Sequence, residues 1–118
     1  MIQMRGEKML AAFPLNNSAD FTNRPDLISS LYIPEVIERG AATKLEGTWT
    51  SDDTFLLMTD ALGCWFFKDK ESGGQPWNRL RHFGCQSPGD FADWINGLRE
   101  SHEIKNDDVT LIYVNVKR

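Results

Sequence analysis

The stretch DTFLLMTDAL, residues 53–62, decides the fold. It contains a continuous apolar run that ends at Asp60. An unbroken run of this length is typical of a central strand that is buried on both faces, so we predict a strand over 54–59. A helix is expected to follow over 61–68, since an acidic residue at that boundary suits a helix start. The sequence therefore predicts a buried strand that delivers an aspartate at its carboxyl end.

A second stretch, NDDVTLIYV at 106–114, places acidic residues directly before another apolar run. Both alternating faces of 109–116 are largely apolar, which again predicts a central strand. The clearest helix precedes it, over 88–102, with Ser87 suited to the N-cap and Pro88 to the first helical position. Its apolar stripe follows the spacing i, i+3, i+4, i+7 and comprises Phe91, Trp94, Ile95 and Leu98.

The first half of the chain is less regular. Two apolar patches separated by Gly6 predict a β-hairpin over 1–13. Asparagines and prolines punctuate 14–40, where we expect loops and short helical turns. Alternation over 45–50 predicts a half-buried strand, and Asp52 and Asp53 are interpreted as residues of the turn after it. Strands and helices grouped in this way predict an α+β fold.

The composition of the chain limits the classes of protein to which it can belong. The chain has 118 residues, 41% of them hydrophobic and 25% charged, which fits one folded domain, or part of one, over 1–118. A net charge of −4 without a basic stripe argues against nucleic acid as a partner. Neither a membrane-spanning run nor a signal peptide is recognisable, and Cys64 and Cys85 lack metal-ligand spacing. A reduced, cytoplasmic protein is the expectation.

The two acidic stretches resemble the closing motifs of the protein phosphatase 2C family of metal-dependent serine/threonine phosphatases. In that family a strand ends in Thr-Asp-Gly, and an Asp-Asn or Asp-Asp pair precedes the last core strand. Here the first motif reads Thr59-Asp60-Ala61, a variant that resembles some bacterial members, and the second contains Asp107-Asp108. Because alanine replaces glycine, the variant suits only a backbone without positive φ at Ala61. The resemblance covers most of the chain and implies a partial α-β-β-α sandwich, with strands from both mainly antiparallel sheets and helices on one face.

The resemblance also implies a chemistry. Members of the family hydrolyse phosphoserine and phosphothreonine in phosphoproteins through two Mg2+ or Mn2+ ions, hard cations that require oxygen ligands. By resemblance, Asp60 and Asp107 are metal ligands. The family's N-terminal half supplies a further acidic ligand, an aspartate that bridges both ions and a phosphate-binding arginine, and this sequence has no counterpart of them. We therefore expect the chain by itself to be inactive or weakly active.

Other interpretations remain open. Asp60 also suits a helix cap, Asp107 and Asp108 also suit a polar turn, and Cys64 suits a small core residue. A non-catalytic phosphatase-like module that binds or regulates a partner is the main alternative function, and an unrelated α+β domain is a third. A half-domain leaves sheet edges and one sheet face uncovered, so we expect self-association or a partner chain that completes the fold.

Overall fold

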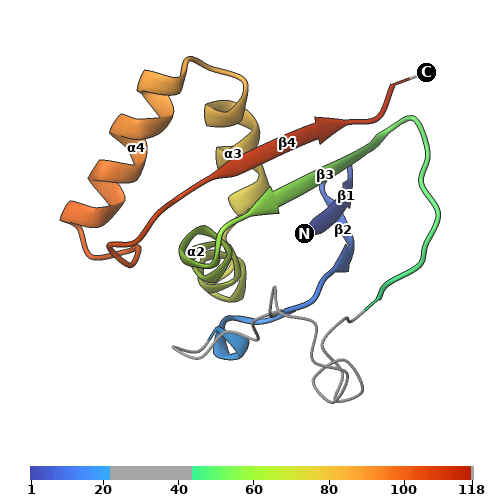
Figure 1. Ribbon diagram of the computed structural model, residues 1–118, viewed down its shortest axis with the longest axis horizontal. Helices are drawn as coiled ribbons and strands as arrows, with labels where there is room; N and C mark the ends of the chain where they lie inside the picture. Colours follow the sequence, from blue (N-terminus) through green and yellow to red (C-terminus); the bar gives the residue numbers. More distant parts are fainter. Residues whose placement is uncertain (22–43, 118) are drawn as a thin grey trace, which may run out of the picture.

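The computed structural model describes residues 1–21 and 44–117, which form an α+β fold (Figure 1). Within these residues, one four-stranded antiparallel sheet carries three α-helices and a short 3-10 turn. The elements in chain order are β1 (Ile2–Arg5), β2 (Lys8–Ala12), η1 (Ser18–Asp20), β3 (Asp53–Met58), α2 (Asp60–Glu71), α3 (Pro76–Gly84), α4 (Pro88–Glu100) and β4 (Leu111–Asn115). The predicted α+β class is confirmed.

The strands lie in the order β2-β1-β3-β4, with each neighbouring pair antiparallel. The N-terminal hairpin is confirmed: β1 pairs with β2 across a turn in which Gly6 has a φ of 58°. The strand predicted over 54–59 is β3, which lies between β1 and β4. Its predicted burial on both faces is wrong, because the Leu57 side chain is exposed. The strand predicted over 109–116 is β4. The prediction that it is a central strand is wrong, because β4 is outermost among the described strands.

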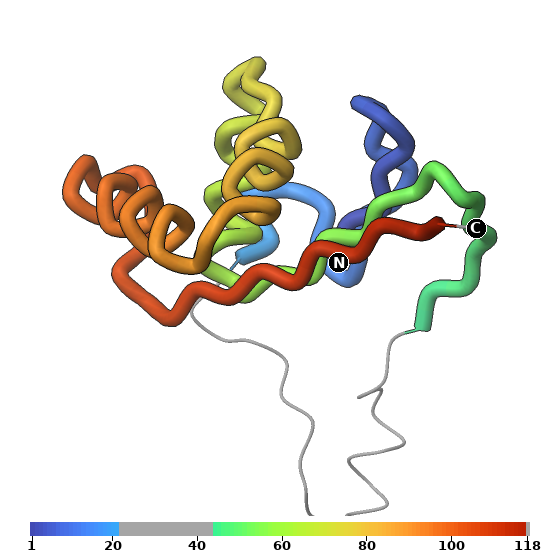
Figure 2. Tube along the Cα trace, turned by 90° about the horizontal axis from the view of Figure 1, so that it is seen from above, coloured from blue at the N-terminus to red at the C-terminus, as the bar shows by residue number. Residues whose placement is uncertain are grey.

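The helices pack on one face of the sheet (Figures 1 and 2). Leu56 of β3 points to this face together with Ile2 and Met4 of β1, and all three side chains are buried. The helices cover them with the following buried residues: Leu62, Trp65 and Phe66 of α2, Leu80 of α3, and Ile95 and Leu98 of α4. The helix predicted from Pro88 is confirmed, including its cap, since Ser87 Oγ accepts from the Asp90 N–H at 3.3 Å.

The opposite face of the sheet carries a block of apolar side chains, which we call the open-face patch: Phe55, Leu57, Ile112 and Val114. The register pairs Phe55 with Val114 and Leu57 with Ile112, so all four point away from the helices. Ile112 is 54% exposed, and Leu57 and Val114 are also exposed. The apolar character of both faces of β4, which predicted a central strand, therefore reflects helices on one face and this patch on the other. The described strands form one sheet, whereas strands from two sheets were expected.

The strand predicted over 45–50 is wrong. This segment is exposed and forms no ladder, and Trp49 is 64% exposed. Its polar contacts go to side chains instead, since Gln3 Nε2 donates to the Thr48 carbonyl at 3.0 Å and the Thr50 N–H donates to Asp53 at 3.0 Å. An alternating pattern without a neighbouring strand is not enough for a ladder. Most of the region 14–40, expected to be loops and turns, lies outside the described residues.

Candidate functional site

Asp60 and Asp107, the two predicted metal ligands, line the same cleft. Its volume is about 300 Å3, and it lies between the first turns of α2 and the segment that connects α4 to β4. The residues around it are Phe21, Asp60, Ala61, Cys64, Trp65, Lys68, Glu103, Ile104, Lys105 and Asp107. The fold thus places two residues that are far apart in the sequence along one cleft.

Asp60 reaches the cleft because β3 stops and α2 begins directly after it. Asp60 is the first residue of α2, and the N-cap position belongs to Thr59. The interpretation of Asp60 as the cap residue is therefore wrong. Its exposed carboxylate still lies in the first turn, where the helix dipole favours a negative charge. Ala61 lies inside α2 without positive φ, so the alanine of this motif fits its backbone.

Two hydrogen bonds join the segments that carry the aspartates. The Thr59 N–H donates to the Thr110 carbonyl at 3.2 Å, and the Thr110 N–H donates to Thr59 Oγ1 at 3.0 Å. The Thr59 hydroxyl therefore accepts from Thr110 and does not cap its own helix. This pair, together with the pairing of Met58 with Leu111, fixes the start of α2 against the start of β4. Sequence reasoning missed both threonines, although Thr59 directly precedes Asp60 and Thr110 follows Asp107 by three residues.

Asp107 lies in the connecting segment and is held by its main chain. Its N–H donates to the Lys105 carbonyl at 2.9 Å, and Arg99 Nη2 donates to its carbonyl at 2.7 Å. One carboxylate oxygen, Oδ1, accepts from the Asp108 N–H at 2.8 Å. The turn expected at 107–108 is consistent with these contacts, and the Asp107 side chain is exposed.

The remaining side chains give the cleft mixed charge over an apolar floor. Glu103 adds a third carboxylate, while Lys68 and Lys105 add positive charge. The floor includes Trp65 and Ile104, which are both buried. Cys64, interpreted as a core residue, is only partly buried and lies in the cleft wall. The cleft is therefore lined by charges of both signs.

The donors of the cleft fit a divalent metal ion in part. Carboxylate oxygens are the ligands that Mg2+ and Mn2+ prefer. However, residues 1–21 and 44–117 contain no group of three or more His, Cys, Asp or Glu side chains close enough to hold a metal ion. Asp60 and Asp107 can therefore supply part of a coordination shell. These two carboxylates alone do not complete the coordination shell of such an ion.

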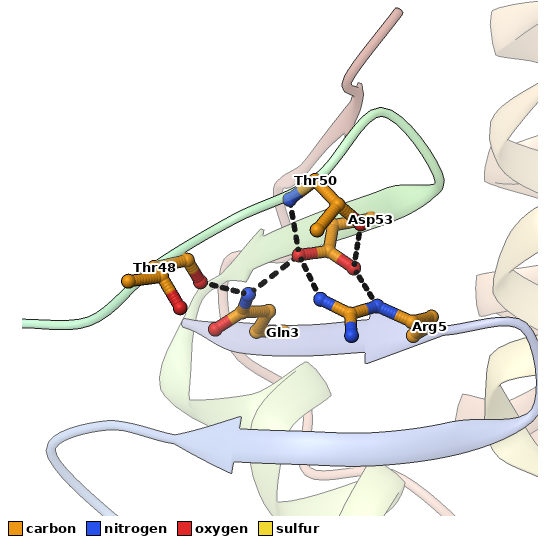
Figure 3. A network of polar contacts seen from close by, with 5 residues as sticks. All are labelled: Gln3, Arg5, Thr48, Thr50 and Asp53. Carbon is orange, nitrogen blue, oxygen red and sulfur yellow. Dashed lines mark hydrogen bonds and ion pairs between the residues drawn. The ribbon is translucent and has the colours of Figure 1, made fainter.

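A second polar cluster surrounds the buried carboxylate of Asp53, at the opposite end of β3 from Asp60 (Figure 3). Arg5 donates from Nε and Nη2 to its two oxygens at 2.7 and 3.1 Å, and Gln3 Nε2 donates at 2.8 Å. The hydrogen bonds from Arg5, with smaller contributions from Thr50 and Gln3, hold the pKa of Asp53 well below its ordinary range despite desolvation.

The interpretation of Asp53 as a turn residue covers only part of its role, because its N–H closes the turn on the Thr50 carbonyl at 3.1 Å while its side chain is buried in this network. It is the first residue of β3, and its carboxylate links β1 and the segment 48–50 to that strand. The Asp53 carboxylate uses most of its acceptor capacity in hydrogen bonds within the fold, so it has little left to bind a ligand. The missed signal was Arg5 in the predicted hairpin, since a buried charge requires a partner.

Comparisons of the chain with models of protein families, with curated proteins and with solved structures found no match. Among the described residues, none of the helices has the length and apolar character needed to cross a membrane. Both cysteines, Cys64 and Cys85, are free thiols.

Proposed function

We propose that the chain is the C-terminal portion of a Mg2+- or Mn2+-dependent protein serine/threonine phosphatase similar to the protein phosphatase 2C family. Asp60 and Asp107 are its metal ligands. One observation supports this proposal above the others: two aspartates selected from separate motifs line one cleft.

The proposed reaction is hydrolysis of a phosphoserine or phosphothreonine ester in a phosphoprotein substrate. When bound, the metal ions supply an activated water and neutralise charge on the phosphoryl group. The chain's own residues orient the site: the start of α2 carries the Asp60 carboxylate, and the Thr59–Thr110 pair ties that start to the start of β4. Lys68 and Lys105 place positive charge in the same cleft, which favours the approach of an anionic phosphoryl group.

The site is incomplete in the part of the chain that the structure describes, so the isolated chain is expected to be inactive or weakly active. In this proposal the described sheet is one layer of an α-β-β-α sandwich. The open-face patch is then the surface on which the second sheet packs. A second copy or a partner chain would cover it where the second sheet is missing.

A non-catalytic phosphatase-like module that binds or regulates a partner is the second candidate. The exposed apolar side chains of the open-face patch favour it, because contiguous apolar surface marks an interaction site. This candidate does not require Asp60 and Asp107 to bind metal together. Metal binding therefore separates the two functions.

The test is titration of the chain with Mn2+, followed by electron paramagnetic resonance of the free ion. We expect weak binding that is lost in Asp60→Asn and in Asp107→Asn, and that is unchanged in Asp93→Asn. Asp93 is a matched control because it is an exposed aspartate on α4 outside the cleft. Equal Mn2+ binding by all four proteins would refute the proposal.

Hydrolysis of p-nitrophenyl phosphate with Mn2+ tests the expected incompleteness. Slow or absent turnover agrees with a partial site. Turnover that Asp60→Asn and Asp107→Asn both abolish would show that the chain, or an assembly of it, builds a working site, and incompleteness would then be wrong.

A further inference from the structure

β4 is an edge strand, and among the described residues no strand pairs with its outer side (Figure 1). Just beyond its two ends, the Thr110 carbonyl and the Val116 N–H both bond to main-chain groups on the β3 side. Main-chain groups of an antiparallel strand point to alternate sides, so every second residue between these two also faces β3. The N–H and carbonyl groups that point outward therefore belong to Leu111, Tyr113 and Asn115.

The two edges of the sheet differ in how they are protected against further pairing. β2, the opposite edge, contains Lys8, and its register against β1 shifts between Gln3 and Met4. A lysine and a bulge are two of the features by which natural sheets block an edge strand. β4 contains neither, because its sequence LIYVN has no charge and no proline and its register against β3 is regular. β4 is therefore the edge that is open to another strand.

Charged residues of opposite sign flank β4. Asp108 precedes the strand and Lys117 follows it, and both side chains are exposed. If a second copy of β4 pairs antiparallel about Tyr113, Lys117 of each copy lies opposite Val109 of the other, next to Asp108. A parallel arrangement would instead place like charges side by side, which is unfavourable. The ends of the strand are thus complementary to those of a second copy in the antiparallel direction.

We propose that the outer edge of β4 binds a second copy of this chain, with the two β4 strands paired antiparallel about a two-fold axis at Tyr113. The pairing joins the four-stranded sheets of both copies into one. Tyr113 pairs with its own equivalent, and Leu111 of each copy pairs with Asn115 of the other. Every outward main-chain group of the strand then has a hydrogen-bond partner.

The open-face patch supports the same arrangement. Ile112 and Val114 are exposed side chains of β4 on that face. In the proposed register Ile112 of each copy lies opposite Val114 of the other, so apolar cross-strand pairs form on both sides of the axis. The inference goes beyond the proposed function and does not depend on it, because it uses no residue of the cleft.

The test is sedimentation velocity of Asp108→Lys, of Lys117→Asp and of their equimolar mixture, with the wild type for comparison. Each variant alone should dimerise roughly tenfold more weakly than the wild type, because both flanking charge contacts become repulsive. In the mixture the two substitutions compensate each other at both contacts, so association should return to near the wild-type level. Lys8→Asp is the matched control, since it makes the same charge change at the exposed end of β2 and should leave association unchanged.

Amide hydrogen exchange of the wild type provides a second readout that requires no substitution. Edge pairing should slow exchange at the outward N–H groups of Tyr113 and Asn115 as the protein concentration rises. Dimers in which the Tyr113 N–H stays unprotected would assign the contact to stacked open faces and would overturn the proposal. A mixture that associates no better than its two components would also overturn it. So would a wild type that remains monomeric up to about 1 mM.

Discussion

Gly63 lets Phe21 pack against α2, and its substitution by alanine tests that contact. Gly63 is buried in the second turn of α2. A Cβ placed on it would lie 2.9 Å from both Cε1 and Cζ of Phe21, closer than carbon atoms normally approach. Phe21 also contacts Phe67, with ring centroids 6.0 Å apart, and lines the cleft beside Asp60. Gly63→Ala should therefore displace the Phe21 ring.

The size of the effect follows from two opposing contributions. Replacing glycine by alanine inside a helix raises the free energy of unfolding by about 0.5–1 kcal/mol. Inserting a methyl group into a packed site lowers it by about 1–3 kcal/mol. The net expectation for Gly63→Ala is a loss of about 1 kcal/mol, measured by urea unfolding followed by circular dichroism.

Gly97→Ala is the matched control. Gly97 lies inside α4, is exposed, and has no heavy atom within 4 Å of the added Cβ. Only the effect of replacing glycine by alanine inside a helix applies there. Gly97→Ala should therefore raise the free energy of unfolding by about 0.5–1 kcal/mol. The reasoning is refuted if the two substitutions change the free energy of unfolding equally and in the same direction.

Three further predictions concern acid stability, capping and association. The lowered pKa of Asp53 stabilises the folded state above the ordinary value of 3.8, and this stabilisation is lost as pH falls below it. Between pH 5 and pH 2.5, the free energy of unfolding measured with urea should therefore fall less in Arg5→Gln than in wild type. An equal fall in both proteins would contradict the stabilising role of the Arg5–Asp53 contact. Ser87→Ala should lower the free energy of unfolding by about 1 kcal/mol through loss of the α4 cap, and no change in urea unfolding would argue against it. Ile112→Thr should weaken concentration-dependent association in sedimentation velocity, and undiminished association would exclude the open-face patch as the contact.

Much of the α+β fold was predictable because its strongest elements carry local signals. The apolar run of β3 and the amphipathic stripe of α4 each determine their own structure, and Gly6 marks the hairpin turn. The segment 45–50 shows the limit of such signals. Its alternation predicts a strand, but a strand also needs a neighbour to pair with, and no local pattern reports that.

The two aspartates of the candidate cleft were predictable, and the contacts around them were not. Asp60 and Asp107 each stand beside an apolar strand, whereas Arg99 contacts the Asp107 main-chain carbonyl, a bond that no side-chain pattern reveals. Asp53 was missed for a similar reason. Its role depends on Arg5, which lies far away in sequence and meets it only through the pairing of β1 with β3.

The central claim is that Asp60 and Asp107 bind one ion together, and a double-mutant cycle of Mn2+ affinity tests it most directly. The four proteins are the wild type, Asp60→Asn, Asp107→Asn and the double variant. If both carboxylates hold the same ion, each single substitution should cost nearly as much affinity as the double one, so the effects are strongly non-additive. A single variant that still binds one Mn2+ ion with wild-type affinity would show two independent sites and would contradict the account.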